Sequence, residues 1–222
     1  YTIYSGVLNS PHAASNSSGV GFDEETNRVG FIRNNAGIIY EYLASDLTSI
    51  EREITLGGNF DDMEGLTYMG NGEIAVCAEN GGGYYVYIYD LPTGSTNITI
   101  QPKQLLTIAD ADTVNNNSSL EGITYDKILK IFWAVGEGEE AGSNRRIFRF
   151  ARPVNTTTDY TSDDPELTIE EPFVAETFFA PYGATGQVFD LSGLSMDMTT
   201  GNLLVLSDTG SRLLQLNVDT PE

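Results

Sequence analysis

The sequence predicts an all-β protein of the β-propeller class. Three observations support this prediction: a sheet-forming motif occurs four times, apolar residues alternate with the period of a β-strand, and turns rich in glycine and asparagine separate the strands. The chain has 222 residues, a length at which such a fold forms one domain. We therefore expect residues 1–222 to form a single β-propeller domain of four or five blades.

Each copy of the motif contains three predicted strands. A small or acidic residue and a glycine open an alternating strand, a second strand rich in β-branched and aromatic residues follows, and a third strand ends the copy. The copies open at about residues 18, 64, 121 and 192. The segments that align are SGVGFDEETNRVGFIRNNAGIIYEY (18–42), EGLTYMGNGEIAVCAENGGGYYVYIYD (64–90), EGITYDKILKIFWAVGEGEEAGSNRRIFRF (121–150) and SGLSMDMTTGNLLVLSDTGSRLLQLN (192–217).

A fourth, outer strand is predicted after the first three copies, which would make each blade a four-stranded antiparallel sheet. These outer strands are expected at 50–56, 104–108 and 167–174. The last copy has no strand after it, whereas residues 1–8 have strand composition. Because a propeller must bury both terminal blade edges, we expect residues 1–8 to close the last blade. A ring of four blades, a ring of five with an irregular blade from 153–190, and a truncated chain all stay open.

The repeat resembles the SdiA-regulated (YjiK-like) family of β-propellers. The stretches that carry the resemblance are DDMEGLTYMGNGEIAVCAE (61–79), SLEGITYD (119–126) and DLSGLSMDMTTGNLLVLSDTGSRLLQL (190–216). The family typically has a further copy with a Glu-Gly opening, which this chain lacks. More distantly, the arrangement is similar to propellers of the gluconolactonase type and to esterase-like phytases. That similarity implies acidic residues over a central divalent metal, but only at the level of the fold.

Composition narrows the class of partner. The chain has 32 acidic and 11 basic residues and a formal net charge of −21, which disfavours nucleic acid and anionic membranes as partners. No apolar stretch is long enough for membrane insertion. We expect a protein or glycan ligand, or self-association. A secreted or extracellular-surface location is expected from five Asn-x-Ser/Thr glycosylation sites, at Asn16, Asn97, Asn116, Asn117 and Asn155.

A candidate metal site follows from the repeat. The residues that open the copies should converge at one mouth of the central channel, and these are Ser18, Glu64, Glu121 and Ser192. The ends of the second strands supply an equivalent set, Asn34, Glu79, Glu137 and Asp208. Both sets offer only oxygen ligands, which Ca²⁺ prefers. The alternative is that Glu64 and Glu121 accept hydrogen bonds that link one blade to the next, without an ion.

No catalytic residues are assigned, because the chain has few of the histidine and cysteine side chains that could act as a nucleophile or activate one. His12 is the one histidine and precedes the first copy, and Cys77 is the one cysteine and lies in the apolar run EIAVCA. The leading hypothesis is a non-catalytic extracellular binding or assembly module, with a structural calcium ion in the channel. Two alternatives remain: a metal-dependent phosphoesterase or lactonase that uses the channel carboxylates, and a polymer subunit linked by strand exchange.

Overall fold

The computed structural model describes residues 17–58, 62–80, 83–94, 96–108, 120–136, 146–152, 191–207 and 212–218. These ranges contain fifteen β-strands, arranged in four small sheets, and one short 3-10 helix. No helix in these ranges is long and apolar enough to cross a membrane. The protein is therefore all-β in its described part, as the alternating pattern predicts.

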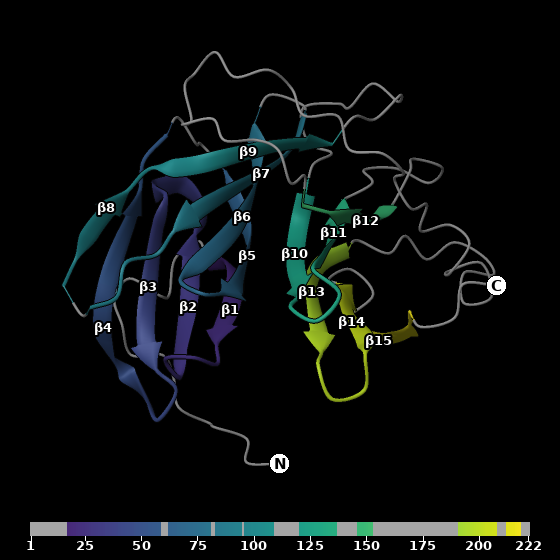
Figure 1. The fold of residues 1–222 in the computed structure, drawn as a ribbon, viewed down its shortest axis with the longest axis horizontal. Helices are drawn as coiled ribbons and strands as arrows, with labels where there is room; N and C mark the ends of the chain where they lie inside the picture. Colours follow the sequence, from purple (N-terminus) through teal and green to yellow (C-terminus); the bar gives the residue numbers. More distant parts are fainter. Residues whose placement is uncertain are drawn as a thin grey trace.

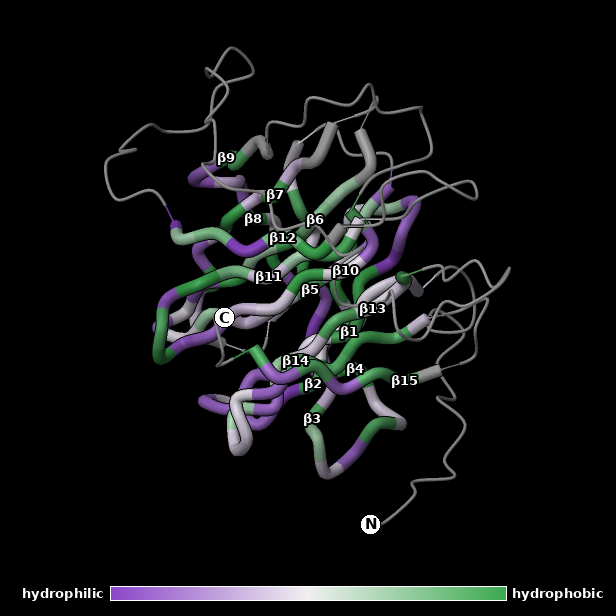
Figure 2. Tube along the Cα trace, turned by 90° about the vertical axis from the view of Figure 1, so that its right-hand side faces the viewer, coloured by the Kyte–Doolittle hydropathy of each residue, from purple (hydrophilic) through white to green (hydrophobic). Residues whose placement is uncertain are grey.

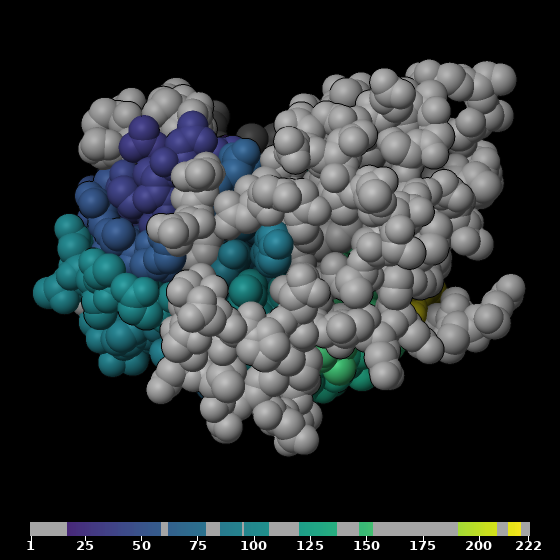
Figure 3. Space-filling model, turned by 90° about the horizontal axis from the view of Figure 1, so that it is seen from above, coloured from purple at the N-terminus to yellow at the C-terminus, as the bar shows by residue number. Residues whose placement is uncertain are grey.

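The first sheet has the strand order β1-β2-β3-β4-β8. Its elements are β1 (Ser17–Asp23), β2 (Arg28–Arg33), the 3-10 helix η1 (Asn34–Ala36), β3 (Ile38–Leu43), β4 (Asp46–Leu56) and β8 (Ile98–Ile100). The predicted outer strand at 50–56 is confirmed as part of β4. The fifth strand, β8, was not predicted. It pairs in parallel with β4, with Ile54 opposite Ile98, and its atoms lie beside those of the first sheet (Figure 3).

Polar contacts explain why β8 joins the first sheet. Arg52 donates from Nη1 to the carbonyl oxygens of Pro92 and Gly94, at 2.8 and 3.0 Å, in the segment that leads to β8. The backbone N–H of Glu53 donates to Oδ1 of Asn97 at 3.0 Å. Side chains on β4 and beside β8 thus hold a segment that follows the second copy of the motif against the first sheet.

The remaining sheets follow the order of the motif. The second sheet, β5-β6-β7-β9, consists of β5 (Met63–Gly70), β6 (Glu73–Asn80), β7 (Gly83–Asp90) and β9 (Pro102–Ile108). It is four-stranded and antiparallel as predicted, and β9 contains the outer strand expected at 104–108. The third sheet has β10 (Leu120–Asp126), β11 (Ile131–Gly136) and β12 (Arg146–Ala151). The fourth has β13 (Leu191–Asp197), β14 (Asn202–Ser207) and β15 (Arg212–Asn217).

The third and fourth sheets have three strands each among the described residues. The outer strands predicted for them, at 167–174 and 1–8, lie outside the described residues. In the second and fourth sheets, the turns between first and second strands use residues that tolerate left-handed backbone: Asn71 and Gly72 have φ of 55° and 70°, and Gly201 has φ of 71°.

The innermost strands β1, β5, β10 and β13 lie next to one another in this order (Figure 1). Three apolar clusters fill the space between successive sheets, and Figure 2 shows hydrophobic colour along the central strands. Ile39 and Tyr89 belong to the cluster between the first two sheets, Phe132 and Leu106 to the next, and Trp133 to the third. The core is therefore a series of sheet-to-sheet interfaces rather than one central mass.

Candidate functional site

The residue that opens each copy of the motif lies at a β-bulge. Pairing between the first and second strands skips one position in all four sheets: between Ser17 and Gly19, Met63 and Gly65, Leu120 and Gly122, and Leu191 and Gly193. The skipped residues are Ser18, Glu64, Glu121 and Ser192. A bulge removes a residue from the hydrogen-bond ladder and redirects its side chain, and bulges are frequent beside functional sites.

The glycine after each bulge allows neighbouring innermost strands to approach closely. A Cβ on Gly19 would lie 2.9 Å from Cα of Gly65, a Cβ on Gly65 would lie 3.1 Å from Cα of Gly122, and one on Gly122 would lie 3.1 Å from Cα of Gly193. The first of these distances is shorter than real Cβ atoms show, and the other two are tighter than nine in ten real Cβ contacts. The four glycines therefore stack from sheet to sheet and bring the bulged residues to one end of the strands.

Glu64 is held by a residue of the other predicted set. It is 9% exposed, and Nδ2 of Asn34 donates a hydrogen bond to its Oε1 at 2.6 Å. Asn34 begins η1, immediately after β2. Glu64, which opens the second copy of the motif, therefore contacts Asn34, which follows the second strand of the first copy.

Glu121 lies near the same region, as the Cys77 thiol shows. Burial raises the pKa of Cys77 well above its usual value, and the negative charges of Glu121 and Glu64 raise it further. Cys77 Sγ lies 3.5 Å from the carbonyl oxygen of Leu120 on β10. The charges of both carboxylates thus act on a buried thiol that stays protonated. A cysteine nucleophile requires the thiolate, so Cys77 is a packing residue.

Two buried oxygens of the predicted site residues have no hydrogen-bond partner in the described part of the chain. They are Oδ1 of Asn34 and Oγ of Ser192. Leaving a buried oxygen without a donor costs free energy unless a water molecule or a cation occupies the space next to it. Together with the carboxylates they form an oxygen-only donor set, which fits a hard cation such as Ca²⁺.

Farther along the innermost strands from the bulged end lies a pocket of about 170 Å³. All four strands line it, through Val20 and Phe22 of β1, Leu66 of β5, Thr124 of β10, and Leu194 of β13, among others. Its lining mixes apolar side chains with polar ones, such as Thr124 and Glu24, so oxygen atoms are not confined to the bulged end. The four innermost strands therefore share one space, as the motif predicts.

Comparison with known proteins places this chain in a family. The family model of the SdiA-regulated proteins matches residues 6–221. The chain belongs to the SdiA-regulated family. The resemblance of the motif to this family is thereby confirmed. No protein of curated function matches the chain in sequence.

Solved structures show which fold this SdiA-regulated family member has. The glutaminyl cyclase of Myxococcus xanthus matches with a TM-score of 0.54 and 14% identity, over 90% of this chain and 71% of that one. Nidogen, from a nidogen/laminin complex, matches with a TM-score of 0.54 and 15% identity, over 90% of this chain and 60% of that one. Both are β-propellers. At these identities the likeness concerns the fold alone.

The structure describes some of the remaining predicted metal ligands and glycosylation sites. Glu79 pairs through its backbone with Tyr84 in the β6–β7 ladder, while Glu137 and Asp208 lie outside the described residues. Of the glycosylation sites, Asn97 is exposed beside β8, and Asn16, Asn116, Asn117 and Asn155 lie outside the described residues. Within the described ranges, no three His, Cys, Asp or Glu side chains gather as a metal cluster.

Sequence reasoning missed a second pocket, between the second and third sheets, which Lys127, Lys130 and Arg152 help to line. A signal for it was present in the sequence: the turn Lys-Ile-Leu-Lys places two aliphatic residues between two lysines of an acidic chain.

Proposed function

We propose that this protein is a non-catalytic, secreted or surface-exposed β-propeller that acts as a binding or assembly module, with a structural calcium ion at the bulged end of its channel. The observation that carries the proposal is the equivalent bulge in every sheet. It puts Glu64, Glu121 and Ser192 at equivalent places near the start of neighbouring innermost strands, and Asn34, which contacts Glu64, and Ser192 each have a buried oxygen without a partner among the described residues. The finer fold is part of the proposal: one domain over residues 1–222 with four or five blades.

The calcium ion would have a structural role. Glu64 and Glu121 would be its charged ligands, and Asn34 and Ser192 would add neutral oxygens from the two outer sheets of the series. Two nearby carboxylates repel each other, and a divalent cation turns that repulsion into attraction. Because the ligands come from four sheets, a bound ion would link all of them. Calcium should therefore stabilise the folded state.

The test is thermal unfolding of the metal-stripped protein during a calcium titration, with magnesium as a second ion. A ligand that binds only the folded state raises the midpoint with its concentration. We expect a rise of several degrees in wild type and its loss in Glu64→Gln and Glu121→Gln. Glu53→Gln, on β4, removes the same charge away from the bulged end and should keep the rise. An unchanged midpoint in wild type would refute the calcium site.

The same variants distinguish a non-catalytic module from a metal-dependent hydrolase. Metal-dependent turnover of a phosphoester or a lactone that disappears in Glu64→Gln or Glu121→Gln would replace the non-catalytic module with an enzyme in which bound water is the nucleophile. Calcium stabilisation without turnover supports the module.

Assembly by strand exchange is a second candidate, and the fourth sheet favours it. Among the described strands β15 is an edge strand, with β14 on one side. An unpaired edge accepts a strand from its own chain or from another molecule. Residues 1–8 are the proposed closing strand. The mass in solution should fall from oligomer to monomer when residues 1–8 are removed, if the strand is exchanged. A monomer in both cases would leave the closure within one molecule.

A further inference from the structure

The turn between β10 and β11 differs from its counterparts in the other sheets. The turns Glu24–Asn27 and Met198–Gly201 occupy the same place in the first and fourth sheets, and each ends in a residue with positive φ, 54° at Asn27 and 71° at Gly201. Asparagine and glycine adopt left-handed backbone readily. In the third sheet the same position is Lys130, with φ of 58°. A lysine there is strained, and strain kept at one repeat but not at its equivalents points to a function.

The same turn exposes aliphatic surface. Ile128 is 76% exposed and Leu129 is 53% exposed, whereas the corresponding positions of the first and fourth sheets hold Glu25 and Thr26, and Thr199 and Thr200. Lys127 and Lys130 flank the two aliphatic residues. The turn therefore offers a positively charged and apolar surface on a chain whose net charge is −21. An amphipathic anion matches such a surface.

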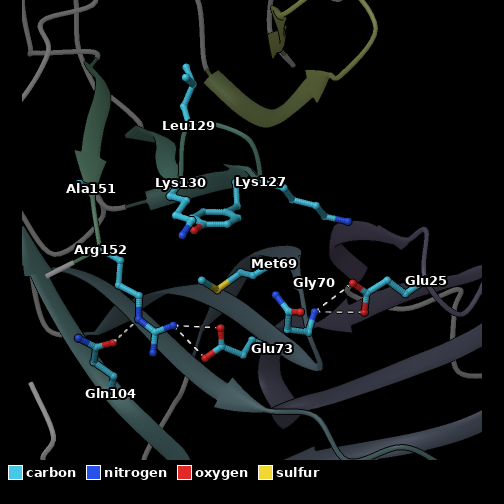
Figure 4. Close-up of a pocket in the computed structure, with 12 residues that line it drawn as sticks. Glu25, Met69, Gly70, Glu73, Gln104, Lys127, Leu129, Lys130, Ala151 and Arg152 are labelled. Carbon is cyan, nitrogen blue, oxygen red and sulfur yellow. Dashed lines mark hydrogen bonds and ion pairs between the residues drawn. The ribbon is translucent and has the colours of Figure 1, made fainter. Parts of the chain in front are cut away.

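A pocket of about 680 Å³ lies beside this turn, between the second and third sheets (Figure 4). This volume is typical of small-molecule sites. Lys130 and Arg152 reach into it from the third sheet, Met69 lies on the opposite side, and Leu129, which also lines it, extends outward from the turn (Figure 4). Basic and apolar side chains thus share one cavity.

The acidic groups of the pocket are already engaged. Nη1 of Arg152 donates to both carboxylate oxygens of Glu73, at 2.8 and 3.0 Å, and Lys103 forms an ion pair with the same carboxylate. Glu25 accepts hydrogen bonds from the backbone N–H of Asn71 at 3.0 and 3.1 Å. Burial alone would raise the pKa of Glu73, but the hydrogen bonds from Lys103 and Arg152 outweigh it and lower the pKa. The Glu73 carboxylate therefore stays ionised and paired, and the Glu25 carboxylate is taken up by hydrogen bonds from the backbone.

The donors of the pocket are less fully engaged. Lys130 has no ion-pair partner in the part of the chain that the structure describes. Arg152 uses Nε for Oε1 of Gln104 and Nη1 for Glu73, and its Nη2 has no partner among the residues that the structure describes. Burial raises the pKa of Tyr125, which lines the same pocket, so its hydroxyl keeps its proton at neutral pH. Three kinds of donor thus face one space.

We propose that this pocket binds a small amphipathic carboxylate. Lys130, Arg152 and the Tyr125 hydroxyl bind the carboxylate group, and the aliphatic part of the ligand covers Met69 and Leu129. The strained lysine is kept because glycine or asparagine at that position would remove the ammonium group. This site is at the opposite end of the innermost strands from the bulges and does not depend on the calcium proposal.

The first experiment uses octanoate as the probe, in calorimetric titrations of calcium-free protein at low ionic strength. Octylammonium and octanol are controls with the same aliphatic chain and a positive or no charge. We expect octanoate to bind more tightly than either control, and added salt to weaken it, because charge pairs near a surface are screened. Equal binding of the three probes, or no binding of octanoate, would overturn the proposal.

A pair of variants separates binding from folding. Lys130→Gly removes the ammonium group and relieves the backbone, so we expect about tenfold or greater loss of octanoate affinity with an unchanged or raised thermal midpoint. Asn27→Gly is the matched change in the first sheet and should leave octanoate affinity unchanged. Lys130→Arg should retain most of it. Unaltered affinity in Lys130→Gly would contradict the assignment even if octanoate binds elsewhere.

Discussion

The second and fourth sheets are built from the same motif but differ in how their faces are covered. The second sheet packs against the first on one face and against the third on the other, and β5 is buried along its whole length. The fourth sheet packs against the third through Leu203 and Val205. Its other face exposes Leu206, at 47%, and Leu213, at 66%.

The glycine stack shows the same difference. Gly65 would place a Cβ within 3.1 Å of the next innermost strand, whereas the nearest atom to a Cβ on Gly193 is Leu206 Cβ of its own sheet, at 3.4 Å. A copy of this motif therefore buries a face only where a neighbouring sheet covers it, and its stability depends on what lies on either side, as in other repeat architectures.

The largest effect is expected at the buried link between the first and second sheets. Tyr68 of β5 donates to Oε1 of Glu41 at 2.7 Å, and Arg52 forms an ion pair with the same fully buried carboxylate. Arg52→Met leaves that charge without its main partner, which should lower the free energy of unfolding by about 3–5 kcal/mol. Urea denaturation measures it.

Lys103→Met is the control for that variant, because it removes a cation from a partly exposed pair with Glu73 and Asp90. It should cost about 1 kcal/mol or less. Equal losses in the two variants would mean that the buried Arg52–Glu41 pair, which holds the acceptor of the Tyr68 hydroxyl, contributes no more than a partly exposed ion pair.

The next effect compares the two faces of the fourth sheet directly. Leu203 is fully buried, and Leu203→Ala should cost about 2–5 kcal/mol. Leu213→Ala, on the uncovered face, should change the free energy of unfolding by about 0.5 kcal/mol or less. Urea denaturation of both variants at several protein concentrations checks this. A large, concentration-dependent loss in Leu213→Ala would show that another molecule covers this face in solution.

The smallest effect concerns the glycine stack. Gly65→Ala would place a methyl group 2.6 Å from Cys77 Sγ and 2.9 Å from the backbone nitrogen of Ile123. Overpacking of this kind costs about 1–3 kcal/mol. Gly193→Ala meets only ordinary contact distances and should be nearly neutral. Similar thermal midpoints for the two variants would argue against close stacking of the innermost strands in solution.

The three strands of each copy could be predicted from the sequence because their signals are local. Alternation of apolar residues and turn residues such as Asn71-Gly72 depends on a few neighbouring positions. The parallel strand β8 could not be predicted in this way. It is three residues long and joins the first sheet through contacts with Arg52 and Glu53, more than forty positions away.

The candidate sites divide in the same manner. Glu64 and Glu121 were found because they recur at the same place in the motif, although nothing in the sequence says that each is the unpaired residue of a bulge. The pocket at Lys130 was missed because its walls come from different copies: Met69 and Gln104 from the second sheet, Tyr125 and Arg152 from the third. The motif consists of the residues that its copies share, whereas this pocket is lined mostly by residues that differ between the second and third copies.

By itself, the sequence determined the motif, its four copies and the strands within each, because a β-strand records its burial in a period of two residues. Only the tertiary structure decided which sheet faces are covered, which edge β8 joins, and that the left-handed Lys130 lies beside an open pocket. These features depend on contacts between residues tens of positions apart. Such contacts produce no repeating pattern in the sequence of either segment, so they can be recognised only in the packed structure.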